Sequence, residues 1–238
     1  EVLRSITNNE DLIKVLCGQY GDYGLPPKQS SFVMHASVAR HYFSGGSFPI
    51  GGSSKIVETV NKVIESAGGN ILISAEAEEV VIKNNKAIGV KMTDGKVISA
   101  KNVISGAGVM TTYNKLISKE IVEKHKLKSQ LKTVKRSVSH ACLYIGLKGS
   151  PEELNLPKTN YWIYPEKIDH DTAINNYLKD LNQDFPVVYI SFPSAKDSDW
   201  SNRYPGKSTI DIITLLPYEP FNKWNGSRWM KREKEYND

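Results

Sequence analysis

The stretch that decides the fold spans residues 41–54 and has the sequence HYFSGGSFPIGGSS. Pro49 fixes its own φ, and Gly51 and Gly52 carry no Cβ, so the backbone here can lie within contact distance of a ligand. Because a helix is predicted to begin directly afterwards, we expect free amide donors that suit a flat or anionic ligand. A plain connection from loop to helix explains the same residues equally well.

The predicted helix covers residues 53–67 and ends at Gly68-Gly69. A strand is then expected over residues 70–75, followed by a three-stranded meander and a buried returning strand over 102–105. The meander strands are predicted at residues 79–83, 87–92 and 96–100. The pair Asp94-Gly95 strongly favours a tight turn, and we expect no helix among these strands.

The flanking regions have a different pattern. Helices are predicted over residues 11–20 and 30–43, a long helix over 118–133, and widely spaced alternating strands after it. These strands are expected at residues 139–147, 160–164, 187–192 and 209–215, with a helix near 171–181. This order predicts an antiparallel sheet covered by helices, which is an α+β arrangement.

Composition excludes several classes of protein. Of the 238 residues, 39% are hydrophobic and 24% charged, with a formal net charge of +5, which is typical of a globular chain. The two cysteines, Cys17 and Cys142, are too few for a disulfide scaffold, and their apolar neighbours predict buried, inert thiols. No run of about 18 apolar residues and no signal-peptide pattern occurs, which favours a cytoplasmic or peripheral membrane location.

The densest basic stretch covers residues 119–136 and is predicted to be the solvated face of a helix. It lacks interleaved aromatic residues and any nucleic-acid-binding signature, so no nucleic-acid partner is expected. Contact with an anionic membrane surface is the stronger alternative for this stretch.

The familiar catalytic motifs are missing from the sequence. The five histidines have no metal-ligand spacing with one another or with the cysteines, so no metal is expected. There is no Gly-x-Ser-x-Gly nucleophile, P-loop or Gly-x-Gly-x-x-Gly motif. Gly106-Ala107-Gly108, after the predicted strand, meets only part of a dinucleotide-binding fingerprint. The catalytic residues are therefore unknown from sequence.

The order of these segments carries more information than any one of them. The turn at 41–54, the helix, the meander and the small-residue turn at 106–108 together resemble the central region of the phytoene desaturase and carotenoid isomerase family of FAD-dependent oxidoreductases. Three further stretches are similar to the retinol saturase branch of that family, and the resemblance runs from about residue 12 to residue 224. They are GDYGLPP at 21–27, ISFPSAKD at 190–197 and YPGKST at 204–209.

The resemblance implies a mixed α/β and α+β fold. Residues 51–117 would form part of a Rossmann-like FAD domain with its β-meander, and residues 1–50 and 118–238 the substrate domain of helices and an antiparallel sheet. Members of the family begin with a Gly-x-Gly-x-x-Gly segment and end with another glycine-rich flavin segment, and neither occurs here. We therefore expect an internal fragment, which by itself binds FAD weakly or not at all.

The resemblance also implies an activity. FAD would carry the redox chemistry, NADH or NADPH is a candidate reductant, and the substrate would be an apolar retinoid or carotenoid polyene. One carbon–carbon double bond of that polyene would be saturated or isomerised. Two alternatives stay open: a flavoprotein of the amine-oxidase class with a polar substrate, and a non-catalytic binding domain. The oligomeric state is also open.

Site residues follow from the same resemblance. Ala77 matches the position where the backbone meets the adenine, and Gly106 and Ala107 match a segment passing near FAD. Pro49, Gly51 and Gly52 match a turn near the flavin and the substrate. Walls of an apolar substrate tunnel are expected at Tyr144, Tyr161 and Trp162, for which an ordinary place in the core is the alternative.

Overall fold

The computed structural model describes residues 1–134 and 139–227 of the chain. The chain divides into two compact units, one formed by residues 1–59 with 137–238 and the other by residues 60–136. Helix α3 (Ser54–Ser66) contains the point of division. The domain limits expected from the sequence, at residues 50 and 117, stay a prediction.

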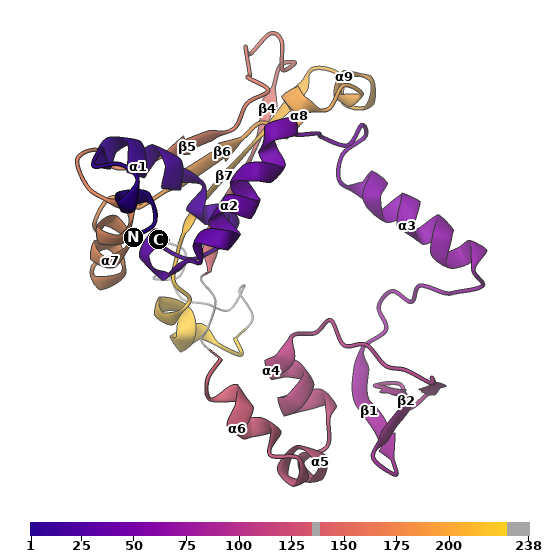
Figure 1. The fold of residues 1–238 in the computed structure, drawn as a ribbon. Coiled ribbons are helices and arrows are strands. Elements are labelled where there is room, and N and C mark those ends of the chain that lie inside the picture. The colour runs from indigo at the N-terminus through magenta and orange to yellow at the C-terminus, as the bar shows by residue number, and fades with distance from the viewer. Residues whose placement is uncertain (135–138, 228–238) are drawn as a thin grey trace. The chain divides into compact units, whose positions relative to one another are not determined.

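The larger unit is built on a four-stranded antiparallel sheet (Figure 1). Its strands, in spatial order, are β4 (His140–Lys148), β7 (Lys207–Leu215), β6 (Val188–Ser191) and β5 (Tyr161–Ile163). Strands β4 and β7 pair without a bulge, from His140 opposite Leu215 to Lys148 opposite Lys207. The antiparallel sheet predicted from the alternating segments is confirmed.

Three longer helices accompany this sheet, at the positions that the sequence predicts. They are α1 (Glu10–Cys17), α2 (Phe32–His41) and α7 (His170–Lys179). Asn9 caps α1 by accepting from the Leu12 N–H at 3.0 Å, and Asp169 caps α7. The shorter helical segments are η1 (Leu3–Ser5), η2 (Gly18–Asp22), η3 (Pro27–Gln29), η4 (Tyr42–Ser44), α8 (Pro193–Lys196), α9 (Trp200–Arg203) and η6 (Glu219–Trp224).

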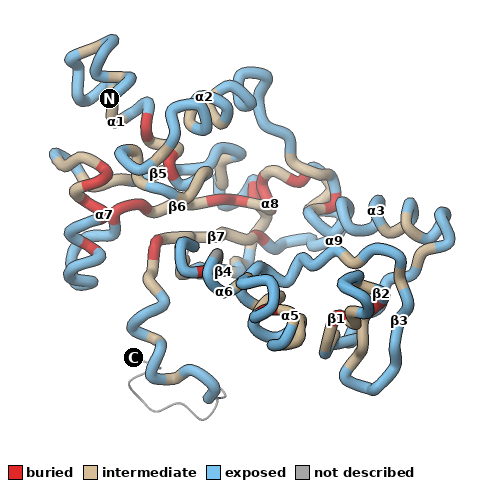
Figure 2. Tube along the Cα trace, turned by 60° about the horizontal axis from the view of Figure 1, so that its bottom comes forward, coloured by how far each residue is buried: buried red, intermediate tan, exposed pale blue. Residues whose placement is uncertain are grey.

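The core of the larger unit joins η2 and α7 to the sheet. It consists of Tyr20, Ile174, Tyr177, Val187 and Leu215, with Trp162 and Tyr164 packed against it. Buried positions accordingly follow α7, β6 and α8 in Figure 2. This cluster removes apolar area from water at the end of the sheet where the N-terminal segments dock.

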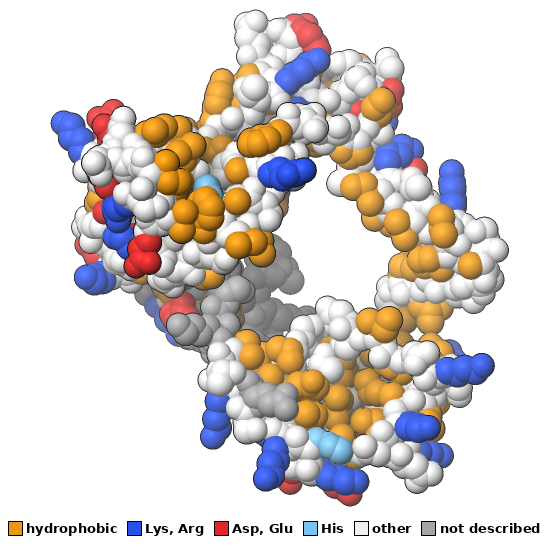
Figure 3. All heavy atoms as spheres, viewed as in Figure 1, with side chains coloured by type: hydrophobic (Ala, Val, Ile, Leu, Met, Phe, Trp, Pro, Cys, Tyr) orange, Lys and Arg blue, Asp and Glu red, His pale blue; other side chains and the backbone are white. Residues whose placement is uncertain are grey.

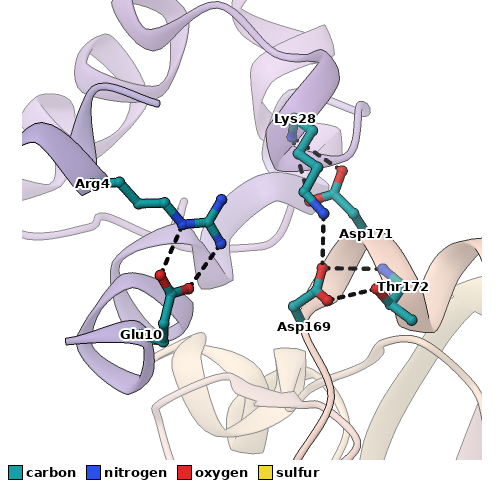
Figure 4. Close-up of polar contacts among 6 residues, drawn as sticks. All are labelled: Arg4, Glu10, Lys28, Asp169, Asp171 and Thr172. Carbon is teal, nitrogen blue, oxygen red and sulfur yellow. Dashed lines mark hydrogen bonds and ion pairs between the residues drawn. The ribbon is translucent and has the colours of Figure 1, made fainter. Parts of the chain in front are cut away.

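Polar contacts fix the N-terminal segments against α7 (Figure 4). The Asp171 carboxylate accepts from the backbone N–H of Lys28 at 3.1 Å, and Asp169 accepts from the Lys28 ammonium at 3.5 Å. Asp169 also accepts from the backbone N–H of Thr172, and Arg4 forms a bidentate pair with Glu10 at 2.8 Å. The short helix η3 is thereby tied to the start of α7.

Apolar side chains also lie on the outer surface of the N-terminal segments (Figure 3). Val33 and Met34 of α2 are 74% and 53% exposed, and Phe43 after it is 85% exposed. In α3, Ile56, Val60 and Val63 on the predicted apolar face are exposed as well. The amphipathic helices of the sequence thus form, but the described residues leave part of their apolar surface uncovered.

The smaller unit contains the meander. Strands β1 (Ala77–Lys83), β2 (Lys86–Met92) and β3 (Val97–Ser99) form an antiparallel sheet in chain order, with Val80 opposite Val90 and Val90 opposite Ile98. Gly95 has φ of +86°, as the predicted tight turn requires. No helix falls between residues 79 and 100, all of which the structure describes, so the meander is confirmed.

The two strands expected on either side of the meander are not formed. Residues 70–75 and 102–105 have no strand conformation, and Ile73 and Ile104 are 85% and 96% exposed. A short apolar run becomes a strand only when a neighbouring strand accepts and donates its backbone hydrogen bonds. Among the described residues no strand pairs with either segment.

Two further expectations are corrected. The helix predicted over 118–133 is two short helices, α5 (Lys119–Lys124) and α6 (Leu127–Leu131), because Lys126 between them has a left-handed φ of +51°. Cys142 is exposed rather than buried, since it lies on the edge strand β4, whereas Cys17 is buried as expected. The segment from Val109 to Leu116 forms α4 (Val109–Thr111) and the π-helical turn η5 (Thr112–Leu116).

Both described sheets are antiparallel, which is compatible with the mixed class expected from the sequence. The Rossmann-like part of that expectation stays a prediction. In residues 1–134 and 139–227 no helix has the length and hydropathy needed to cross a membrane.

Candidate functional site

One face of the four-stranded sheet carries an apolar row of side chains across all four strands. Trp162 pairs with Tyr189, Tyr189 with Ile213, and Ile213 with Cys142, so the four project from the same face. We call them the apolar row and the face that bears them the groove face. The Trp162 and Tyr189 rings meet edge to face with centroids 4.8 Å apart.

A cavity of about 350 Å³ lies over the apolar row. Its other walls are Gly21 and Asp22 of η2, and His140, Val187, Thr214 and Leu215 at the end of the sheet. Such a volume is near the lower limit of small-molecule sites, which span roughly 300–1,000 Å³. Gly21 is needed here because a Cβ on it would lie 2.7 Å from Cζ3 of Trp162.

A polar row lies next to the apolar row on the same face. Ser191 pairs with Asp211, and Asp211 with Tyr144, each two residues along its strand from a member of the apolar row. The ammonium of Lys196 extends to this row and donates to Ser191 Oγ at 2.7 Å and to Asn160 Oδ1 at 2.6 Å. Burial lowers the pKa of Lys196, and the nearby Asp211 carboxylate opposes that effect.

The turn at residues 48–52 is attached directly to this end of the groove face. The Lys196 Nζ atom lies 5.5 Å from the centroid of the Phe48 ring. The next residue, Asp197, accepts from the Gly51 N–H at 2.9 Å. The Gly52 N–H donates to the Pro49 carbonyl at 2.9 Å. Two of the amides expected to be free are therefore bonded within the protein.

Asp197 is the buried anchor of that turn. Its side chain is 1% exposed, accepts from the Asp199 N–H at 3.0 Å, and pairs with the guanidinium of Arg203. Burial acts to raise the pKa of the Asp197 carboxyl, but the two backbone amides and Arg203 outweigh burial and hold the pKa below its ordinary value. A charged carboxylate is thus kept in place under the turn.

The backbone of the turn combines positive φ angles with free space on one side. Gly51 and Gly52 have φ of +89° and +83°, a region that favours glycine. A Cβ on Gly52 would meet no atom within 4 Å, whereas one on Gly51 would meet the side chain of Lys55. Free space therefore lies beside Gly52, and Pro49 is half-buried at the start of the turn.

The predicted tunnel residues fall on both faces of the sheet. Trp162 and Tyr144 lie on the groove face, where Trp162 is half-buried and Tyr144 is 73% exposed. Tyr161 is next to Trp162 in β5, so it projects from the opposite face, where its ring packs edge to face against Phe192. Two of the three residues therefore share the groove face.

The remaining predicted residues belong to the smaller unit. Ala77 is half-buried at the first position of β1. Gly106 and Ala107 are exposed in the loop before α4, and a Cβ on Gly106 would meet no atom within 4 Å. Their assignment to FAD stays a prediction. Within the described part of the chain, no group of three or more His, Cys, Asp or Glu could hold a metal ion.

Sequence reasoning missed Lys196, Ser191, Asn160 and Asp197 as parts of the site. Three of them lie within residues 190–197, a stretch that the family resemblance had marked. Alternation places Ser191 on the same face as Tyr189, and this signal could have been used. The bond from Gly51 to Asp197 spans 146 residues, and nothing local in the sequence indicates it.

Comparison with known proteins identifies relatives of this chain. The chain is 35% identical over 244 residues to an all-trans-retinol 13,14-reductase of Danio rerio, covering 99% of this chain and 40% of the relative. The all-trans-retinol 13,14-reductase of Homo sapiens has the same identity and coverage. A chloroplastic prolycopene isomerase of Daucus carota is 26% identical over 196 residues, which is 82% of this chain and 29% of the relative. No protein-family model matches the chain.

The chain spans about 40% of the length of the reductases that it matches. The alignment extends over nearly all of its residues, so it includes both rows of the groove face and the turn at 48–52. This chain is therefore a homologue of the retinol 13,14-reductases, within the retinol saturase and carotenoid isomerase branch that its motifs predict.

Proposed function

We propose that the protein to which these residues belong is a flavin-dependent oxidoreductase that saturates a carbon–carbon double bond of a retinoid or a similar polyene. The observation that carries the proposal is the groove face, where an apolar cavity lies over the apolar row and the polar row beside it binds Lys196, whose Nζ lies 5.5 Å from the Phe48 ring of the turn at 48–52. Relatives named as retinol 13,14-reductases support the choice of reaction.

The residues of the turn fit a flavin. The free space beside Gly52 and its missing Cβ allow a planar ring to lie against the backbone. Asp197 holds the turn in place through Gly51, and Pro49 limits its backbone freedom. Bound flavin would supply the hydride, and NADH or NADPH is the candidate source of its electrons. The family resemblance implies that Ala77, Gly106 and Ala107 contact FAD, and the proposal includes this role for them.

The chain itself would bind and orient the polyene. Trp162, Tyr189 and Ile213 offer an apolar surface that excludes water from the substrate, which favours burial of a hydrocarbon chain. The exposed apolar side chains of α2 also support peripheral contact with a membrane, where such substrates dissolve.

The test uses the complete gene product, purified and examined for flavin absorbance. Incubation with all-trans-retinol and a reductant should give a product heavier by two hydrogen atoms, identified by mass spectrometry. Prolycopene as substrate would instead reveal an isomerase, whose product has unchanged mass. A protein that contains flavin but converts neither polyene would refute the proposal and favour the amine-oxidase alternative. A protein that contains no flavin would favour a non-catalytic binding domain.

A further inference from the structure

Lys196 is held with part of its hydrogen-bonding capacity unused. An ammonium has three N–H donors, and the described residues supply two acceptors, Asn160 Oδ1 and Ser191 Oγ. The Phe48 ring covers one side of the group, and Ser191 is itself buried. A half-buried ammonium that the Phe48 ring shields on one side can donate its third N–H to an oxygen of a ligand.

The position of Lys196 gives the groove face two different ends. Residues on one face of a strand recur every second position, about 7 Å apart. The row of His140 and Leu215 and the row of Tyr144 and Asp211 are therefore about 14 Å apart along the strands. The cavity itself is lined by the apolar row and by no residue of the polar row. A ligand with its apolar body over Trp162 would therefore extend from the cavity along the sheet face, beyond Tyr189, to bring its other end to Lys196.

We propose that Lys196 binds the oxygen-bearing end of the polyene and thereby selects polyene alcohols over hydrocarbons. The proposal rests on the proposed function and adds a specificity-determining residue and the orientation of the substrate. In all-trans-retinol the carbon that carries the hydroxyl is bonded directly to the last double bond of the chain. With the hydroxyl at Lys196, that bond lies at the end of the groove where Phe48 and the glycine turn are attached.

The experiment measures selectivity rather than affinity alone. The complete gene product is titrated with all-trans-retinol and with the hydrocarbon that has a methyl group in place of the hydroxymethyl group. Binding is followed by quenching of tryptophan fluorescence, since Trp162 lines the groove. We expect the wild type to prefer retinol by roughly tenfold, the ratio that corresponds to 1.4 kcal/mol.

Lys196→Met should bring this ratio close to one while the affinity for the hydrocarbon stays the same. The matched control is Lys148→Met, which removes an exposed ammonium from the same face of β4, four residues beyond Tyr144, and should keep the preference. Both ligands are measured on one sample, so the ratio does not depend on the folded fraction. If Lys196→Met does not fold, Lys196→Gln provides the same comparison.

A wild type without preference, or a Lys196→Met protein that keeps the preference, overturns the inference and leaves the proposed function standing. A wild type that binds neither ligand overturns the proposed function and the inference together. A variant that loses affinity for both ligands equally shows that Lys196 supports the structure only, and this also overturns the inference.

Discussion

Replacing Asp197 by Asn should destabilise the larger unit and free the turn at residues 48–52. The carboxylate is 1% exposed and accepts from the backbone amides of Gly51 and Asp199 at 2.9 and 3.0 Å. Hydrogen bonds to a charged acceptor contribute about 1.5–3 kcal/mol each. The ion pair adds less, because Arg203 is 31% exposed and also pairs with Asp199.

Both backbone amides donate to Oδ1 of Asp197, and Arg203 pairs with Oδ2. Asparagine can keep Oδ1 only as a neutral, weaker acceptor, and its NH₂ group then faces the guanidinium of Arg203. We therefore expect Asp197→Asn to lower the free energy of unfolding by about 3 kcal/mol, a fall in Tm of roughly 6–12 °C for a unit of this size. Urea denaturation measures the first quantity and a thermal scan the second. The Gly51 amide should also exchange with solvent faster, since its acceptor is weakened.

The pH dependence provides a second measurement. The pKa of Asp197 is lower in the folded state than in the unfolded state, where it is about 3.9, so its contribution is complete above that pH. The contribution is lost as pH falls through the folded pKa, and Asp197→Asn should therefore lose less stability than the wild type on acidification from neutral pH.

The matched control is Asp199→Asn, which removes the partly exposed carboxylate that pairs with Arg203 at 3.2 Å. It should change stability by less than about 1 kcal/mol. The reasoning would be refuted if the free energy of unfolding of Asp197→Asn were within about 0.5 kcal/mol of the wild-type value. This threshold is well below the contribution of even one charged hydrogen bond. Unchanged protection of the Gly51 amide would refute the reasoning as well.

Three further outcomes are expected. Gly52→Val should abolish turnover and flavin retention in the complete protein with the fold kept by circular dichroism, whereas Gly45→Val, at a similar φ of +85° and also in open space, should retain both. Gly21→Ala should lower stability by about 1–3 kcal/mol and shift tryptophan emission, because the new Cβ meets the Trp162 ring; unchanged emission would contradict this. Burial raises the pKa of Tyr20, so the free energy of unfolding, measured by urea titration, should fall above about pH 10. It should fall less steeply in Tyr20→Phe, and equal slopes of this free energy against pH in the two proteins would contradict the assignment.

The parts of the fold that depend on neighbouring residues could be predicted from sequence. The Asp94-Gly95 turn and the alternation on both sides of it specify a hairpin within some twenty residues, and the meander forms as expected. The strands β4 and β7 could be predicted because polar and apolar residues alternate along much of the segments 139–147 and 209–215.

The parts that depend on distant partners could not be predicted. Residues 70–75 have the composition of a strand, yet strand formation requires a neighbour, and their sequence does not contain that information. Alternation shows that Tyr161 and Trp162 point to opposite faces, but not which face carries the cavity. That choice depends on η2, whose Gly21 makes room for Trp162 from 141 residues away in the chain (162 − 21 = 141).

Lys196 and Asp197 connect the groove face to the turn at residues 48–52. They are consecutive in the chain, yet Lys196 reaches the polar row while Asp197 holds Gly51. The helix that ends at Lys196 is fixed in turn, because the Ser194 hydroxyl, in a residue that is 2% exposed, accepts from the Thr209 N–H of β7 at 3.0 Å. With Pro193 at the start of α8, little freedom remains between the sheet and these two side chains. In the binding mode proposed above, one short helix attached to β7 therefore determines the distance between the oxygen of the polyene and the glycine turn.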